Sequence, residues 1–455
     1  MKLKDYISQN LSRYHSYQKE FHEAVNETLE DIDTDELNAL GLTQETAQRF
    51  FERFIEPDRI IRFKVEWDDD QGRTQINRAW RVQFNNALGV YKGGLRFHPT
   101  CDESTLKFLA YDQIFKNALT GLPMGGAKGG SDFDPKDKSR SEVKRFCQAF
   151  MSELYKYIGS DIDVPAGDIG VGTTEIGILY GQYLKLTNSF EGVLTGKHPH
   201  FGGSCGRAEA TGHGVIYLLR EALKQHDQSL SEKTILISGS GNVALYAVDK
   251  AIDCEAKVLT VSDSNGTLHF KNGITKDQLK QLIEHKHKNK MRLKDWKKSY
   301  NRESDSSITY HPDTNPWQFN AEIIIPCATQ NELDEEDAKK LLKSDVVAVA
   351  EGANMPLTSK AIYQLHQRQV IYLPGKAANA GGVAVSGLER SQNASYIPWD
   401  MKTVDEHLQE IMQSIHKNCI KYIEKENGIY PYKKGANIYA FRKIYSAIQQ
   451  LWPTN

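Results

Sequence analysis

The sequence has no run of roughly 20 apolar residues, the length that a membrane-spanning helix needs. Its first twenty residues also lack the apolar segment of a secretory signal. The cysteines are scattered and form no CxxC pair, so we expect neither a disulfide framework nor a metal site from Cys101, Cys147, Cys205, Cys254, Cys327 and Cys419. These absences favour a cytoplasmic protein with reduced thiols.

Neither sign of charge is in excess, because 57 basic side chains are matched by 59 acidic ones and the formal net charge is -2. Such a chain has no electrostatic drive toward nucleic acid or an anionic membrane. Hydrophobic residues make up 39% and charged residues 25%, which is typical of a globular protein. A length of 455 residues exceeds one ordinary core, so we expect two domains.

The first 200 residues mix helices and strands. Residues 1 to about 55 are predicted to be helical, and the alternation in "FKVEWDD" and "TQINRAWRVQFNN" predicts two strands. Thr100 and Glu103 have capping-box spacing, which predicts a helix from there to about Leu119, ending at Gly121. A second helix is predicted over "SEVKRFCQAFMSELYKYI".

The pattern changes near residue 201. A helix is predicted after Thr211, and "KTILISGSGNVALYAVDKAIDCEAKVLTVSDSNG" predicts a strand, a glycine turn, a helix and a second strand. Short apolar runs follow in "AEIIIPCA", "VVAVAEGAN" and "QVIYLPG", separated by polar helical segments. Strands that alternate with helices predict a parallel, doubly wound sheet. The charged stretch "EHKHKNKMRLKDWKK" is interpreted as a solvated helix face, and "NIYAFRKIYSAIQQLW" as a last helix.

The glycine turn of this βαβ unit has the G-x-G-x-x-A form of a dinucleotide site, with Gly239, Gly241 and Ala244. The helix that follows offers free N–H groups to a pyrophosphate. At the end of the second strand, Asp263 could bind the ribose 2′-hydroxyl of NAD. Ser262, Ser264 and the downstream Lys286 and Lys288 would instead suit the 2′-phosphate of NADP, so these residues leave the choice open.

The stretch "LPMGGAKGGSDFDP" places Lys128 between two pairs of glycines. It is not a Walker phosphate loop, because Gly129 follows where Ser or Thr is required. Two interpretations stay open from the loop itself: a tight turn with a surface lysine, or a lysine that binds substrate or takes part in chemistry.

Other polar residues favour the second interpretation. Lys92 precedes another glycine pair, and Lys116 shares a helix face with Gln113. Several ammonium groups in one cleft suit a dicarboxylate, and they favour the neutral form of the most buried lysine. Asp168, on a glycine-rich loop with no local cation, is predicted to carry protons or to form an Asx-turn.

Several long segments resemble the signatures of the hexameric glutamate dehydrogenases. They are "YKGGLRFHP", "LPMGGAKGGSDFDP", "DVPAGDIGVG", "IIPCATQNEL" and "PGKAANAGGVAVSGLE", and the likeness runs from about residue 45 to the C-terminus. "SDSNG" and "VAEGANMP" resemble the NADP-using members more than the NAD-using ones. The resemblance implies a homohexamer that interconverts L-glutamate with 2-oxoglutarate and ammonium, using NADP(H) and working mainly as an NADPH-dependent amination.

The resemblance also implies residue roles. Lys128 and Asp168 match the catalytic pair. The positions that match substrate contacts are Lys92, Gln113, Lys116, Thr195, Asn379 and Ser386. The positions that match cofactor contacts are Thr211, Gly239, Gly241, Asn242, Val243, Asp263, Ser264 and Lys286.

The expected fold is α/β with two domains. Residues 1–201, rejoined by a C-terminal helix over 430–455, would form an α/β domain for substrate binding and assembly. Residues 202–429 would form a Rossmann-type doubly wound dinucleotide-binding domain, with the active-site cleft between the two. Three positions depart from the family pattern, namely Ala208, His213 and Ser240. We interpret His213 as a packed helical histidine rather than a modulator of pH dependence.

Three alternatives stay open. A sister leucine, valine or phenylalanine dehydrogenase would share Lys116, Lys128 and Asp168 but needs an apolar pocket, against which Lys92 and Ser386 argue. A glutamate dehydrogenase that prefers NAD is the second. A catalytically inactive cofactor-binding protein is the third, and intact Lys128 and Asp168 argue against it.

Overall fold

The computed structural model describes residues 3–287, 291–300 and 306–453, and the chain divides into two compact units. The first unit contains residues 1–205, 385–404 and 437–455. The second contains residues 206–384 and 405–436. Each unit therefore combines segments that lie far apart in the sequence.

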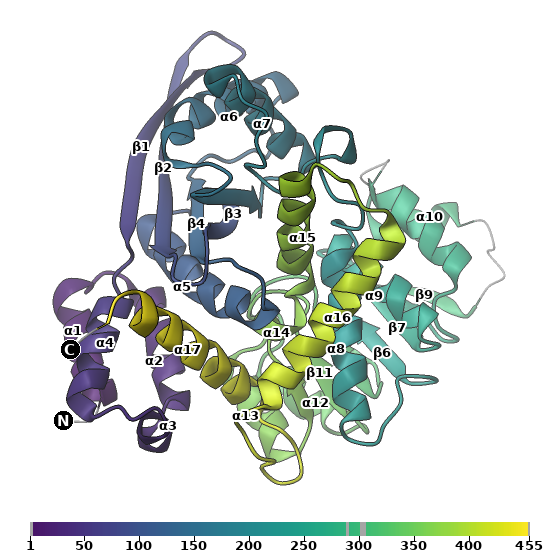
Figure 1. The fold of residues 1–455 in the computed structure, drawn as a ribbon. Coiled ribbons are helices and arrows are strands. Elements are labelled where there is room, and N and C mark those ends of the chain that lie inside the picture. The colour runs from purple at the N-terminus through teal and green to yellow at the C-terminus, as the bar shows by residue number, and fades with distance from the viewer. Residues whose placement is uncertain (1–2, 288–290, 301–305, 454–455) are drawn as a thin grey trace. The chain divides into compact units, whose positions relative to one another are not determined.

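The first unit opens with four helices, as predicted for residues 1 to 55: α1 (Leu3–Tyr14), α2 (Lys19–Asp31), α3 (Thr34–Ala39) and α4 (Gln44–Phe54). Their apolar faces form a core with α5 (Glu103–Thr120) and with the last helix, α17 (Tyr432–Leu451). Within it the ring of Phe441 stacks on Phe51, with 5.3 Å between ring centroids. In Figure 1, α17 lies beside α4 accordingly.

A five-stranded mixed sheet forms the rest of this unit. Its strands are β1 (Arg59–Asp68), β2 (Thr74–Asn85), β3 (Tyr91–Phe97), β4 (Gly126–Ser131) and β5 (Asp163–Gly167), in the order β1-β2-β4-β3-β5. The two predicted strands are confirmed as the antiparallel pair β1 and β2. The prediction of a loop or turn around Lys128 was wrong, because "GAKGGS" is the central strand β4.

The predicted helices of this unit are present, but the predicted cap is not. Asp102, rather than Thr100, caps α5 by accepting a hydrogen bond from Thr105 N at 2.8 Å. Helix α5 ends at Gly121, whose φ of 77° is easy only for glycine. Helix α6 (Arg140–Leu154) begins with a capping box of Ser139 and Glu142, and α7 (Thr173–Thr187) packs beside it.

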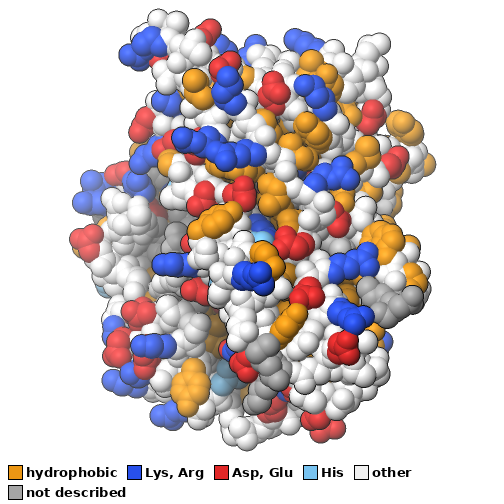
Figure 2. Space-filling view, turned by 90° about the vertical axis from the view of Figure 1, so that its left-hand side faces the viewer, with side chains coloured by type: hydrophobic (Ala, Val, Ile, Leu, Met, Phe, Trp, Pro, Cys, Tyr) orange, Lys and Arg blue, Asp and Glu red, His pale blue; other side chains and the backbone are white. Residues whose placement is uncertain are grey.

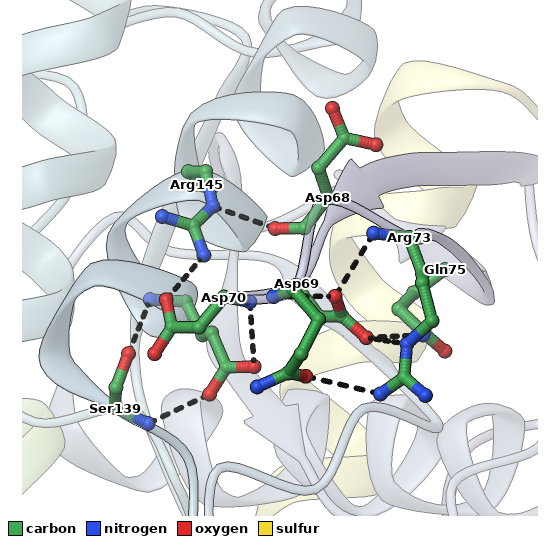
Figure 3. A network of polar contacts seen from close by, with 9 residues as sticks. Asp68, Asp69, Asp70, Arg73, Gln75, Ser139 and Arg145 are labelled. Atoms are coloured by element: carbon green, nitrogen blue, oxygen red, sulfur yellow. Dashed lines mark hydrogen bonds and ion pairs between the residues drawn. The ribbon is translucent and has the colours of Figure 1, made fainter.

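The turn between β1 and β2 is fixed by a polar network at the far end of the hairpin (Figure 3). Asp69 accepts hydrogen bonds from the backbone and guanidinium of Arg73, both at 2.9 Å, and these bonds help hold its pKa at about 2. Arg145 on α6 donates to Asp70 at 2.7 Å. The backbone N–H of Asp70 donates to Glu142 at 3.3 Å. The hairpin end is thereby attached to the start of α6.

The second unit is built on a seven-stranded sheet in the order β12-β11-β10-β6-β7-β8-β9. Its strands are β6 (Thr234–Ile237), β7 (Lys257–Asp263), β8 (Gly266–Phe270), β9 (Ile308–Pro312), β10 (Ile323–Ile325), β11 (Ala348–Ala350) and β12 (Ile371–Leu373). The parallel part is confirmed. The prediction missed β8 and β9, which extend the sheet in antiparallel fashion. A short turn at Ser264 and Asn265 joins β7 to β8, whereas residues 271–307 separate β8 from β9.

Helices complete this unit: α8 (Ala210–Lys224), α9 (Asn242–Asp253), α10 (Lys276–His287), α11 (Leu293–Ser299), α12 (Glu335–Leu341), α13 (Ser359–Gln367), α14 (Gly375–Ala378), α15 (Gly381–Ser395) and α16 (Met401–Ile420). The later parts of α15 and the first residues of α16 belong to the first unit. The basic stretch of α10 and α11 is not only a solvated face, since Leu293 and Trp296 are buried.

All six cysteines are free thiols. In the parts of the chain that the structure describes, no helix is both long and apolar enough to cross a membrane, and no group of His, Cys, Asp and Glu side chains could hold a metal ion. Figure 2 shows basic side chains interspersed with acidic ones over the face that it draws.

Candidate active site

The glycines around Lys92 and Lys128 let two strands pack closely. A Cβ added to Gly93 on β3 would lie 1.6 Å from the backbone oxygen of Ala127 on β4. A Cβ on Gly129 would lie 2.9 Å from atoms of Arg81 and Leu95. Gly93 and Gly129, which directly follow these lysines in the sequence, are therefore needed for close strand packing rather than for a turn.

Lys128 on β4 and Asp168, directly after β5, form a close ion pair. Lys128 Nζ lies 3.2 Å from Asp168 Oδ2, and Arg96 Nε donates to the same oxygen at 2.8 Å. The lysine is 5% exposed. The loop of Asp168 has no cation in its local sequence, and it is β3 that places Arg96 beside it. Sequence reasoning missed Arg96, although it stands in the segment "YKGGLRFHP".

This environment shifts both ionisations. Burial lowers the pKa of the Lys128 ammonium, Asp168 raises it, and the guanidinium groups of Arg96 and Arg81 lower it further, with a net decrease. Burial opposes the ionisation of Asp168, but Lys128 and Arg96 hold its pKa below the ordinary value. A buried amine with a lowered pKa can exchange a proton with a carboxylate beside it more readily than an exposed lysine can.

A second buried ammonium lies on β3. Lys92 is fully buried, and its Nζ donates to Thr195 Oγ1 at 2.8 Å. Thr195 is also fully buried, and its backbone N–H donates to Pro165 O on β5 at 2.9 Å. Ser386 on α15 is 1% exposed and belongs to the same unit. These three predicted substrate contacts are thus buried in the first unit.

Helix α5 carries the next predicted pair, Gln113 and Lys116, and both are half-buried. Gln113 Nε2 donates to Asn117 Oδ1 at 2.8 Å, and Asn117 Nδ2 donates to Lys92 O at 3.2 Å and to Gly125 O at 2.5 Å. Asn117 therefore connects α5 to the backbone of β3 and to the residue before β4. Sequence reasoning missed it, although it stands one helical turn after Gln113.

Asn379 follows α14 in the second unit. Its Nδ2 donates to Ala353 O at 3.1 Å and to Asn354 Oδ1 at 2.9 Å. Glu351 accepts from Tyr372 Oη at 2.9 Å and from Gly375 N at 2.7 Å. These bonds hold the segments after β11 and β12 together.

The dinucleotide turn lies between β6 and α9. Gly239 has a φ of 83°, and its N–H donates to Ser262 Oγ at 2.9 Å. A Cβ on Gly241 would meet nothing within 4 Å, so the space over this turn is open. Asn242 and Val243 begin α9, whose first N–H groups can donate hydrogen bonds to an anion, and Ala244 is buried. This turn fits a pyrophosphate.

The end of β7 gathers the predicted selectivity residues. Asp263 accepts hydrogen bonds from Asn265 N and Leu293 N, both at 2.9 Å. Ser264 is exposed, and Arg292 donates to its hydroxyl at 2.9 Å. Burial lowers the pKa of half-buried Lys286, Asp263 raises it, and Arg292 lowers it further, with a net decrease. Sequence reasoning missed Arg292, although it stands in the charged stretch "EHKHKNKMRLKDWKK".

The other two residues considered for the 2′-phosphate are Ser262 and Lys288. Ser262 is buried and supports the glycine turn, so Ser264 is the predicted hydroxyl that reaches the surface. Lys288 lies outside the described residues.

Helix α8 carries Thr211 and His213. Thr211 is half-buried, and a Cβ on Gly382 would lie 2.4 Å from its hydroxyl. The packed interpretation of His213 is confirmed, since the residue is 4% exposed. Its Nε2 lies 3.3 Å from Asp249, and its Nδ1 lies 3.5 Å from Asp405.

Comparison with known proteins identifies the family. Residues 202–451 match the model described as Glutamate/Leucine/Phenylalanine/Valine dehydrogenase, and residues 57–185 match the Glu/Leu/Phe/Val dehydrogenase dimerisation domain. The chain belongs to this family.

Its relatives match over nearly their whole length. An NAD(P)-specific glutamate dehydrogenase of Xylanibacter ruminicola is 49% identical over 95% of each chain. An NADP-specific glutamate dehydrogenase of Giardia intestinalis is 49% identical over 93% of each chain. The crystal structure of Plasmodium falciparum glutamate dehydrogenase superposes with a TM-score of 0.93 at 47% identity, covering 99% of this chain and 94% of the other.

Proposed function

We propose that this protein is an NADP-dependent glutamate dehydrogenase, which interconverts L-glutamate with 2-oxoglutarate and ammonium. The observation that carries this proposal is the fully buried ammonium of Lys92, held by Thr195 in the unit that also buries Ser386. A buried ammonium beside a hydroxyl suits the binding of a carboxylate, such as the side-chain carboxylate of glutamate. The relatives named above support the same substrate.

In the proposed mechanism, two lysines fix the ends of the substrate. Lys92 binds the side-chain carboxylate, and Lys116, with Gln113 beside it, binds the α-carboxylate. Asn379 and Ser386 complete the contacts. Two charged ends held at a fixed separation select the substrate length and orient Cα for reaction.

Lys128 and Asp168 would then move protons. When bound, NADP⁺ would supply the hydride acceptor for oxidation of the substrate at Cα to an iminium. Lys128 assists the attack of water on that carbon, and Asp168 carries a proton to the departing amine, so that ammonia and 2-oxoglutarate leave. The burial of Lys128 and its contact with Asp168 at 3.2 Å support this role, and its lowered pKa favours proton release relative to an exposed lysine.

The dinucleotide would lie over the glycine turn, with contacts from Thr211, Asn242 and Val243. Preference for the 2′-phosphate rests on Ser264, Lys286 and the additional Arg292. These residues place a hydroxyl and two cations around Asp263, and phosphate favours such donors. Asp263 would act by holding the start of α11, through Leu293 N, rather than by binding the ribose.

We also propose a homohexamer in the cytosol that works mainly in the direction of amination. The match of residues 57–185 to a dimerisation domain supports assembly, and six free thiols suit a reducing compartment.

Initial rates with 2-oxoglutarate and ammonium, compared between NADPH and NADH, test the proposal. Fast turnover with NADPH and slow turnover with NADH is the expected result. Comparable rates would point to a dual cofactor use like that named for the Xylanibacter relative. NADPH binding without any turnover would instead support an inactive cofactor-binding protein.

A leucine, valine or phenylalanine dehydrogenase is the second candidate, because the family includes these activities. The same assay with 4-methyl-2-oxopentanoate separates them. Turnover of this apolar substrate at a rate matching 2-oxoglutarate would reject the role proposed for Lys92.

A further inference from the structure

A buried ion pair lies beside the pocket that contains Lys92. Lys197 Nζ lies 2.9 Å from Glu389 Oε1, and these residues are 3% and 0% exposed. Lys197 Nζ also donates to the backbone oxygen of Leu194 and, at 2.9 Å, to Asn393 Oδ1. None of the roles proposed above uses this pair.

The pair contacts both residues that flank Thr195. Leu194 has a φ of 63° and Gly196 a φ of 86°, so the backbone is left-handed on each side of the threonine. A left-handed leucine is unfavourable by itself and needs contacts that hold it. Lys197 supplies one by donating to Leu194 O, and Glu389 Oε2 supplies another by accepting from Gly196 N at 2.9 Å.

The same helix connects this loop to the remaining pocket residue. Ser386 stands three residues before Glu389 on α15, so both project from one helix face. Both residues lie in the first unit together with Thr195. One helix therefore carries a predicted substrate contact and the anchor of the loop that presents another.

We propose that Lys197 and Glu389 are positioning residues that set the side-chain carboxylate subsite. By fixing the turn on both sides of Thr195, they hold its hydroxyl against Lys92 Nζ and orient that ammonium. The inference rests on the proposed function, because the subsite is defined by glutamate. A buried pair adds little net stability over apolar residues, so stability alone gives weak reason for it here.

Three variants test this role: Glu389→Gln, Lys197→Met and the two combined. Each is assayed for kcat and KM with L-glutamate and with norvaline, which lacks the side-chain carboxylate. We expect the kcat/KM ratio of glutamate to norvaline to fall in all three, by up to about 100-fold, because misplacement of a binding group by about 1 Å has that effect. The loss should appear mainly with glutamate, and KM for NADP⁺ should stay unchanged.

Thermal unfolding separates positioning from stability. Each single variant leaves one buried charge without its partner and should unfold at a lower temperature, whereas the double variant should recover much of that loss. Recovery of the unfolding temperature without recovery of the substrate ratio supports the proposal.

Glu36→Gln serves as the matched control. Glu36 is 7% exposed and pairs with Arg442 at 2.5 Å in the same unit, in the helical core rather than at the pocket. It should lower the unfolding temperature and leave the substrate ratio unchanged. A wild-type ratio in the Lys197 and Glu389 variants would overturn the positioning role, whereas a wild-type enzyme that turns over norvaline but not glutamate would reject the proposed function instead.

Discussion

At the scale of single residues, burial is what makes the two lysines of the sheet unusual. Lys92 and Lys128 stand on adjacent strands, and both are nearly or fully inaccessible. Lys128 has a carboxylate within 3.2 Å, whereas Lys92 has a hydroxyl at 2.8 Å. The first arrangement suits proton transfer, and the second suits the binding of a carboxylate.

Lys128→Ala should lower kcat by about 10²–10⁴-fold, because it removes the buried amine that is proposed to assist water attack. The binding of NADPH, measured by titration calorimetry, should be unchanged. Lys144→Ala, at an exposed lysine of α6, is the control and should keep normal turnover. Near-normal kcat in Lys128→Ala would remove this residue from the mechanism.

Lys92→Leu should impair the use of glutamate far more than the use of norvaline. A buried carboxylate left without its partner costs about 3–5 kcal/mol, which corresponds to a loss of roughly a hundredfold or more in kcat/KM. Steady-state kinetics with both substrates measure the difference. Equal losses for the two substrates would contradict the side-chain role.

Replacing Ser264 and Lys286 together by Ala should weaken the binding of NADPH more than that of NADH. The 2′-phosphate loses a hydroxyl and a cation, while the parts common to both cofactors keep their contacts. Dissociation constants from fluorescence titration give the ratio. Adding Arg292→Ala should lower the preference further, and an unchanged ratio in the triple variant would place phosphate recognition elsewhere.

At the scale of elements, hydrophobic periodicity was a good guide and local rules were weaker. The early helices, the strands β1 and β2 and the βαβ unit lie where their patterns predict. The cap of α5 was predicted at the wrong residue, because the helix begins at Glu103 and Asp102, directly before it, accepts from Thr105 N. Glycine content concealed β4, since glycines in strands are uncommon without close packing.

His213 on α8 lies within ion-pair distance of carboxylates on two other helices, α9 and α16. Burial disfavours its cation, but hydrogen bonds to Asp249 on α9 and Asp405 on α16 raise its pKa above the ordinary value. Burial opposes the ionisation of Asp405, but its contacts with His213, Tyr217 and Lys250 lower its pKa to about 2. The hydrogen bond from His213 likewise helps lower the pKa of Asp249 to about 2.

A raised pKa in the folded state means that His213 stabilises the protein below the unfolded value near 6.5. That contribution is lost as the pH rises through the folded pKa. His213→Gln should therefore reduce the free energy of unfolding more at pH 6 than at pH 9, as denaturant titrations can measure. Both carboxylates stay ionised over this range. An equal reduction at the two pH values would mean that His213 acts through packing alone.

At the scale of the whole molecule, the chain leaves and re-enters the first unit more than once. Residues 437–455 belong to that unit, where Arg442 pairs with Glu36 and Phe441 stacks on Phe51. These contacts span about the full length of the sequence, and the last helix therefore contributes to the core of the first four.

Phe441→Ala should destabilise the protein by about 3–5 kcal/mol, because it empties a fully buried site within an aromatic cluster. Leu451→Ala, on the same helix but 55% exposed, should change stability by no more than about 0.5 kcal/mol. Thermal and denaturant unfolding compare the two. Equal effects would show that α17 adds little to this core.

The sequence by itself determined the α/β class, the dinucleotide turn and the identity of the predicted chemical groups. Periodicity, glycine spacing and long family-like segments are local properties, and they can be recognised without a fold. Only the tertiary structure decided what surrounds those groups. It showed that Arg96 donates to Asp168 and that Asn117 donates to the backbone oxygen of Lys92. It also showed that Arg292 donates to Ser264 and that Glu389 accepts from Gly196, beside Thr195.

The physical reason is that burial and charge pairing arise between residues far apart in the chain. Lys92 and Thr195 are separated by 103 positions, and Lys197 and Asn393, which accepts from it, by 196. The pKa shift of Lys128 depends on such neighbours and on the strands that exclude water from it. Its presence between glycines was visible in the sequence, whereas its position on the central strand of a sheet was not.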